Sequence, residues 1–243
     1  MAIIGVLTAL LLPVLAKTRD RAKEAVCLDH FHQIGIGFKM YQGDNQGRYP
    51  LGGTLITSPG ALIPRGTDRD RMWSFNTALG GADGASGTPM LPPANARPLS
   101  RYVPTPETFR CPADGGINFT ARDGPKWSSS WQRYGCSYRY NAGGWGEGPS
   151  YRTRVSNKSE EWVQEASRFV LVYEPPAKAE TWNNEPFYVR WHRAHPATTD
   201  YGKPAGPLIS PILFADDHAA ILDFTKEVYR HPNDRQVIWY HPE

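Results

Sequence analysis

Hydrophobic and charged positions separate sharply at the N-terminal end of the chain. Residues 1–16 (MAIIGVLTALLLPVLA) carry no charge, whereas the next eight residues, KTRDRAKE, carry six charged side chains. Sixteen apolar residues are fewer than the ~20 that an α-helix needs to cross a bilayer. The run also lacks the basic residues that open a secretory signal peptide. A signal peptide, a buried core helix and part of a membrane helix are the three alternatives.

An amphipathic pattern with the period of an α-helix follows the apolar run. Its apolar positions are spaced by four, three, four and three residues and form one stripe: Cys27, Phe31, Ile34, Phe38 and Tyr41. Charged residues are expected off this stripe: Arg21, Lys23, Glu24, Asp29 and Lys39. Together the two patterns predict one helix that runs from the apolar segment to about Tyr41, bends near Pro13 and ends at the turn residues 43–47.

The remainder of the chain predicts strands joined by long loops. Residues 49–94 are interrupted by Gly and Pro, and a short helix is predicted there around residues 71–79. Tyrosines and a cysteine alternate with other residues over 134–140, which is typical of a half-buried strand. Residues 168–174 (RFVLVYE) predict a central strand, and residues 208–224 predict two strands around a turn. The fold class is therefore α+β, with a long N-terminal α-helix packed on an antiparallel β-sheet head that carries long loop insertions.

Composition and charge narrow the possible functions. Hydrophobic residues make up 40% of the chain, which is enough for a buried core. The formal net charge of +3 and the scattered Lys and Arg residues argue against nucleic-acid binding. The chain has no G-x-S-x-G, H-E-x-x-H or P-loop motif. Glu174 and Asp216 each end a predicted strand and could face each other as an acid–base pair, but caps and turns are the favoured roles. An enzyme is therefore not expected.

Three cysteines are present, and no two have the C-x-x-C spacing of a zinc ribbon or a thioredoxin-like site. In an exported protein one pair can form a disulfide. Cys111 and Cys136 are the expected pair because both lie in the predicted head, whereas Cys27 lies in the helix. Three buried free thiols are an equally good alternative.

The first fifty residues resemble the N-terminal helix of type IV pilin-like proteins and type II secretion pseudopilins. The resemblance is closest to the bacterial group that has a prepilin-type cleavage and methylation segment and a C-terminal His-to-Asp-Gly motif. The matching positions, in order, are Cys27, Leu28, Gln33, Ile34, Gly35, Tyr41, Asp44, Asn45, Gly47 and Pro50.

The head resembles the same group in separate blocks. FRCPADGG (109–116) and YGCSYRYNAGG (134–144) are similar to two of its elements. The hairpin segment LFADDH also matches, except that Asp217 replaces the group's Gly. A turn at this point favours a positive φ, which Gly adopts freely and Asp tolerates at some cost. The upstream His of the motif corresponds to His192 or His195.

The resemblance implies a structural subunit of a type IV pilus-like or type II secretion-like filament. Residues 1–41 would form a membrane and assembly helix in the inner membrane, and residues 42–243 a head in the periplasm or outside the cell. The partners would be copies of the chain and related pilin-like subunits. Four residues of the helix are assigned to the assembly region: Val6, Leu10, Pro13 and Val14. The group's leader and processing site are missing from the sequence, so about nine residues are expected to precede Met1 in a chain whose helix spans the membrane.

Two other functions stay open. The first is a membrane-tethered, extracytoplasmic module that binds a metal or a glycan and does not polymerise. A calcium or other divalent ion could be held by Asp216, Asp217 and His218, with His192 or His195 nearby, although structural hydrogen bonds are the favoured role of these residues. A surface glycan could contact tryptophans in loop-like or edge segments: Trp127, Trp131, Trp145, Trp182 and Trp191. The second is a secreted hydrolase built on Asp216 and His218.

Overall fold

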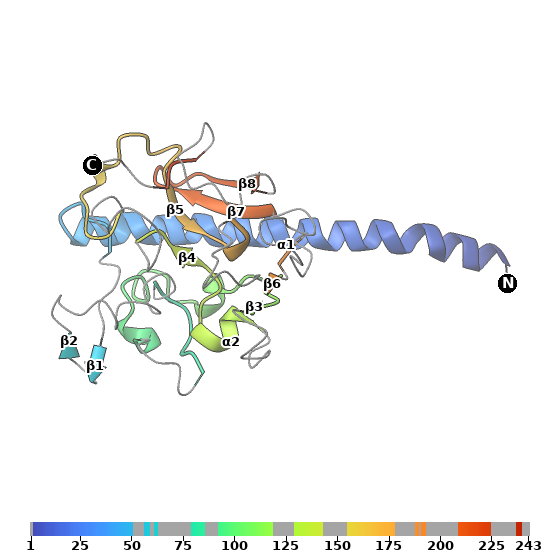
Figure 1. Ribbon diagram of the computed structural model, residues 1–243, viewed down its shortest axis with the longest axis horizontal. Coiled ribbons are helices and arrows are strands. Elements are labelled where there is room, and N and C mark those ends of the chain that lie inside the picture. The colour runs from blue at the N-terminus through green and yellow to red at the C-terminus, as the bar shows by residue number, and fades with distance from the viewer. Residues whose placement is uncertain are drawn as a thin grey trace.

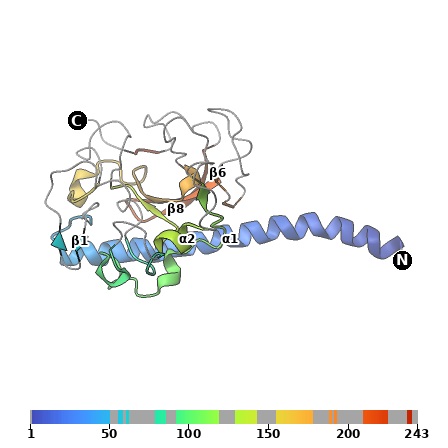
Figure 2. The same ribbon diagram turned by 60° about the horizontal axis from the view of Figure 1, so that its bottom comes forward.

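One long helix passes along a small head and projects well beyond it (Figures 1 and 2). The computed structural model describes residues 2–50, 56–58, 61–62, 79–85, 92–118, 129–142, 155–177, 188–189, 191–192, 209–224 and 237–239. The helix, α1 (Ala2–Asp44), continues through Pro13. Proline has no N–H to donate to the preceding turn, so one helical hydrogen bond is missing there.

The C-terminal end of α1 is closed by a left-handed turn. Gln46 and Gly47 have φ of 57° and 68°. The amide of Gly47 donates to the carbonyl of Gln42 at 2.9 Å, which satisfies one of the last free carbonyls of the helix. The prediction of one helix from the apolar segment to about Tyr41, ended by residues 43–47, is confirmed.

The predicted apolar stripe joins the helix to the head. Cys27, Phe31, Ile34 and Phe38 are fully buried. Tyr41 is half-buried and packs edge-on against Tyr102, with ring centroids 5.9 Å apart. The prediction that Glu24 lies off the stripe is wrong, because its side chain is buried. Glu24 precedes Cys27 by three residues, a spacing that places both side chains on one face of the helix.

The main sheet has four antiparallel strands in the order β4-β5-β7-β8. They are β4 (Arg139–Tyr140), β5 (Val170–Tyr173), β7 (Ile209–Phe214) and β8 (Ala219–Asp223). The hairpin β7–β8 pairs Ile209 with Asp223 and Leu213 with Ala219. Asp217 lies in its turn with a φ of 70°. The central strand, the hairpin and the positive φ expected of its turn are therefore all confirmed.

Both faces of this sheet are covered. On one face α1 packs against β7 and β8. On the other face Tyr173 and Phe224 pack with Trp239 of the C-terminal segment, whose Ile238 forms a parallel bridge with Phe169. All six residues of β7 are buried, as expected of a strand with a layer on each side.

The segment 134–140 differs from its prediction as a half-buried strand. Its first residue ends a short helix, α2 (Ser130–Tyr134), and only β4 is extended in a sheet. Every residue from 134 to 142 is buried, including those at the polar positions of the alternation. Tyr138 packs edge-on against Phe31, at 4.7 Å between ring centroids. The segment lies between the helix stripe and the rest of the head, so both of its sides are covered.

The other described elements are short. They are β1 (Ile56–Ser58) paired with β2 (Ala61–Leu62), β3 (Ile117–Asn118) paired with β6 (Tyr188–Val189), and the 3-10 turns η1 (Ala94–Ala96), η2 (Pro106–Phe109), η4 (Glu160–Trp162) and η5 (Pro175–Ala177). The helix predicted around residues 71–79 falls almost entirely outside the described residues.

Candidate functional site

The N-terminal part of α1 projects beyond the head (Figures 1 and 2), and it exposes large apolar side chains. Five of them are between 55% and 67% exposed: Ile4, Leu11, Leu12, Val14 and Leu15. The side chains of Val6 and Leu10 lie outside the described part of the chain. No helix among the described residues is apolar over a stretch long enough to cross a membrane.

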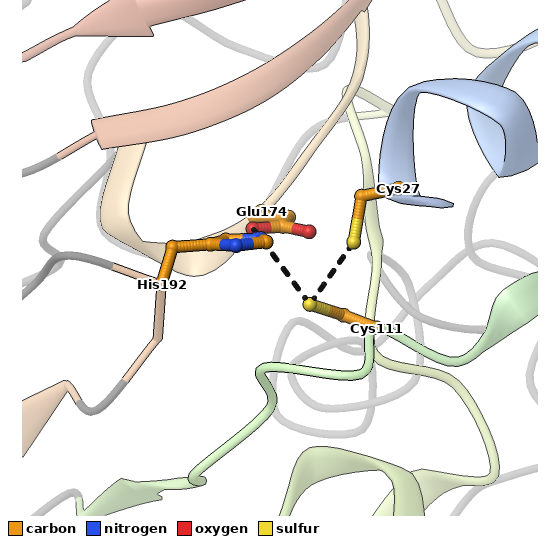
Figure 3. A group of neighbouring side chains, drawn as sticks. All are labelled: Cys27, Cys111, Glu174 and His192. Atoms are coloured by element: carbon orange, nitrogen blue, oxygen red, sulfur yellow. Dashed lines mark hydrogen bonds and ion pairs between the residues drawn. The ribbon is translucent and has the colours of Figure 1, made fainter. Parts of the chain in front are cut away.

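A second unusual feature is a buried cluster of four side chains that bear potential metal-ligand atoms (Figure 3). Cys27 comes from the stripe of α1, Cys111 from the loop after η2, and Glu174 from the residue that follows β5. His192 comes from the short segment after β6. One ligand atom from each residue lies within 4.8 Å of all the others.

The distances within the cluster are short. Cys27 Sγ is 3.2 Å from Cys111 Sγ, and Cys111 Sγ is 3.4 Å from His192 Nε2. The same nitrogen of His192 is 2.9 Å from Glu174 Oε2. The contacts therefore run from Cys27 to Cys111, from Cys111 to His192 and from His192 to Glu174, and the four groups enclose one small volume.

The polar atoms of this cluster are buried and incompletely paired. The side chains of Glu174 and His192 are both 0% exposed. Glu174 Oε2 is paired with His192 Nε2, but within the described part of the chain Glu174 Oε1 and His192 Nδ1 have no hydrogen-bond partner. A buried polar atom without a hydrogen bond costs about 1–3 kcal/mol, so this arrangement needs a compensating interaction.

Burial and the neighbouring charges shift the protonation of the cluster. Burial opposes a charge on His192, but the Glu174 carboxylate together with hydrogen bonds to Cys27 and Glu174 outweighs it, and the pKa of His192 is raised to about 10. Burial, together with a hydrogen bond to Cys27, raises the pKa of the Cys111 thiol. As the side chains stand, the cluster holds an imidazolium–carboxylate pair beside two thiols.

The backbone around the cluster is held in place by polar contacts. The amide of Ala113 donates to Cys111 Sγ at 3.2 Å. The carboxylate of Asp114 accepts hydrogen bonds from three backbone amides and a hydroxyl, and so fixes the loop that carries Cys111: Gly116, Ser130, Trp131 and Ser137. His192 has a φ of 41°, which is uncommon for a residue with a side chain and often marks a functional position.

The hairpin residues proposed as metal ligands are arranged differently. Asp216 Oδ1 is 2.5 Å from His218 Nδ1, and the His218 ring stacks on Phe214 with centroids 4.3 Å apart. Asp217 faces Lys39 at 3.6 Å. In the described part of the chain, the buried cluster is the group in which three or more potential metal ligands lie close together. It contains none of the hairpin residues Asp216, Asp217 and His218. Glu174 and Asp216 each face a histidine instead of each other.

The expected pairing of Cys111 with Cys136 is not the one that the structure shows. All three cysteines are buried free thiols, which corresponds to the alternative. The sulfur nearest to Cys111 is that of Cys27, whereas Cys136 donates to the carbonyl of Tyr138 at 3.4 Å. The reason is that the stripe of α1 buries Cys27 against the loop that carries Cys111.

Two of the five tryptophans considered for glycan contact lie in the described part of the chain. Trp191 is buried, and its indole N–H donates to the carbonyl of Gly116 at 3.1 Å, so it is not a surface residue. Trp131 is half-buried, with the guanidinium of Arg110 at 5.9 Å from its ring. The other three, and His195, fall outside the described residues: Trp127, Trp145 and Trp182.

No family model, curated protein or solved structure matches this chain. The fold itself defines an α+β protein with one long N-terminal helix and a four-stranded antiparallel sheet. The candidate site consists of two thiols, a carboxylate and an imidazole that lie close together where that helix meets the head.

Proposed function

We propose that the chain is a structural subunit of a type IV pilus-like or type II secretion-like filament, assembled through the apolar N-terminal part of α1. The observation that carries the proposal is the exposure of that part: Leu12 is 67% exposed and Ile4 64% exposed, on a helix that extends beyond its own head. Isolated large apolar side chains are common on surfaces, but contiguous ones mark a contact with protein or membrane.

The exposed side chains are distributed around the helix. Ile4, Leu11 and Leu15 are spaced by seven and four residues and share one face, whereas Leu12 and Val14 point to other sides. A helix that is apolar on all sides is normally buried on all sides. A bundle of such helices at a filament axis would bury them in this way, and a bilayer would do so before assembly.

The charged residues that follow support a boundary at this point. Residues 17–24 contain six charged side chains directly after the sixteen uncharged residues. In the proposed arrangement the apolar part is anchored in the cytoplasmic membrane, and the head lies in the periplasm or outside the cell. The partners are further copies of this chain and related pilin-like subunits.

A membrane-tethered metal-binding module that does not polymerise is the second candidate. The buried cluster of Cys27, Cys111, Glu174 and His192 favours a bound ion. It has no exposed member, however, so it does not resemble a site that exchanges a ligand with the surroundings. The two candidates differ in whether the apolar parts of neighbouring chains touch.

Cross-linking in membranes tests this difference. Leu12→Cys places a reactive thiol on the projecting part of α1, and Met40→Cys, on an exposed position 51% accessible, places one near its other end. The native cysteines are buried and serve as the common background. We expect a ladder of cross-linked chains from Leu12→Cys and mainly monomers from Met40→Cys. Monomers alone from Leu12→Cys, with filaments absent by electron microscopy, would favour the tethered module.

A further inference from the structure

We propose that Cys27, Cys111, Glu174 and His192 form a closed zinc site that fastens α1 to the head. The proposal concerns a site distinct from the apolar contact surface and does not depend on filament assembly. It rests on the convergence of four potential ligands, two cysteines, a glutamate and a histidine, in one buried volume, from four separate segments of the chain (Figure 3).

The donor set fits zinc. Zn²⁺ binds Cys sulfur, His nitrogen and carboxylate oxygen in tetrahedral sites, with bonds of about 2.0–2.3 Å. Such bonds place neighbouring ligand atoms about 3.3–3.8 Å apart. The two distances that involve Cys111 Sγ are 3.2 Å and 3.4 Å, and all four ligand atoms lie within 4.8 Å of one another. Thiolate and imidazole together favour zinc over calcium or magnesium.

A metal ion also accounts for the incomplete pairing of the cluster. Within the described residues Glu174 Oε1 and His192 Nδ1 have no hydrogen-bond partner, although both side chains are fully buried. A disulfide between Cys27 and Cys111 would use the two sulfurs and leave Oε1 and Nδ1 of the buried Glu174–His192 pair without partners. A bound zinc ion would displace the protons of the two thiols and of the imidazolium, use all four side chains as ligands and stabilise the carboxylate where it lies.

Two features of the surroundings suit a metal thiolate. The amide of Ala113 points at Cys111 Sγ from 3.2 Å and would donate to a thiolate. Partners of this kind orient the ligands of metal sites and tune them. The four protein ligands leave no open position and none of them is exposed, which is the arrangement of structural zinc sites, not of catalytic ones.

The position of the site indicates what a bound zinc ion would do for the structure. Cys27 is the stripe residue nearest to the projecting part of α1. A zinc ion there ties the helix to three separate parts of the head at the point where the helix leaves it. A pull or twist on the projecting part would then be transmitted to the head through the metal in addition to the apolar stripe.

Metal analysis of the full-length chain tests the proposal. We would purify it in detergent, without chelators, and count zinc per chain, expecting about one. Cys27→Ser and Cys111→Ser should lose the zinc. Cys136→Ser is the matched control, because Cys136 is an equally buried thiol that bonds to Tyr138 and lies outside the cluster. It should keep the zinc in full.

Substitution with Co²⁺ provides a readout that does not depend on the folding of variants. The cobalt-loaded chain should show sulfur-to-cobalt charge-transfer bands and the strong visible bands of a tetrahedral ion, and X-ray absorption should find two sulfur and two lighter neighbours. Absence of zinc and cobalt binding would overturn the proposal, as would equal metal content in Cys27→Ser and the wild type. A Cys27–Cys111 disulfide in most chains, after free thiols are blocked at the moment of lysis, would also overturn it.

Discussion

Cys27 Sγ of the long helix and Cys111 Sγ of the head lie 3.2 Å apart, although 84 residues separate them in the chain. The contact sits at the end of the apolar stripe, where the helix leaves the head. Any bond formed through these sulfurs, with each other or through an ion, would therefore join the projecting part of the molecule to its folded part. Metal binding and thermal stability at this junction can be measured independently of filament assembly.

Removal of metal should destabilise the wild type but not a variant that cannot bind it. With zinc at a hundred times its dissociation constant, binding contributes about 2.7 kcal/mol. For a chain of this size that corresponds to roughly 5–10 °C in Tm. We expect a chelator to lower the Tm of the wild type and of Cys136→Ser by this amount. Cys27→Ser should melt lower from the start and show no response to the chelator, as measured by thermal unfolding in detergent. An equal response in all three would show that the metal binds elsewhere.

The close approach of α1 to the head should make one helical glycine irreplaceable. A Cβ at Gly37 would lie 2.4 Å from Val103 Cγ2, whereas a Cβ at Gly43 would meet nothing within 4 Å. Overpacking of this kind costs typically 1–3 kcal/mol, while Gly→Ala at an open position stabilises by about 0.4–1 kcal/mol. Gly37→Ala should therefore lower the free energy of unfolding and Gly43→Ala should raise it, measured by denaturant titration. Equal effects would contradict the packing of α1 on the loop that holds Val103.

Much of the fold was predictable from local patterns. The period of the apolar stripe identified the helix and its buried face, because helix geometry alone fixes which side chains share a face. The hairpin followed from two β-rich runs around Asp216 and Asp217. The segment 134–140 could not be predicted in the same way. Alternation shows which residues point to opposite sides of a strand, but not that tertiary packing covers both sides.

The buried cluster was not predictable as a site, although each of its members drew attention for another reason. The sequence predicts packing for Cys27 and a disulfide for Cys111, and it offers a carboxylate pair for Glu174 and a metal site near the hairpin for His192 only as alternatives to structural roles. Metal motifs are recognisable when their ligands are spaced closely along one segment. Here the four ligands come from four segments, and only the folded chain brings them together.

The β7–β8 turn should depend on a residue that tolerates a positive φ. Asp217 has a φ of 70°, a conformation that costs most residues roughly 1–2 kcal/mol and that Asp and Asn adopt more readily. Asp217→Ala should therefore lower the free energy of unfolding by about 1 kcal/mol relative to Asp217→Asn. Both variants lose the negative charge that faces Lys39, so their difference contains no contribution from that ion pair. If the two variants unfold at the same denaturant concentration, the turn does not require this conformation.

A charge on the projecting part of α1 should abolish assembly without unfolding the head. Leu12 is 67% exposed and makes no part of the buried core, so Leu12→Asp should leave the melting of the head unchanged. In a helix bundle or a bilayer, however, an aspartate at the centre of an apolar helix costs about 2.5–3.5 kcal/mol in each subunit. We expect filaments to disappear from sheared cell-surface fractions viewed by electron microscopy. Met40→Asp, which introduces the same charge at an exposed position near the other end of the helix, should still assemble. Normal filaments from Leu12→Asp would show that the apolar end of α1 is not the contact that holds the subunits together.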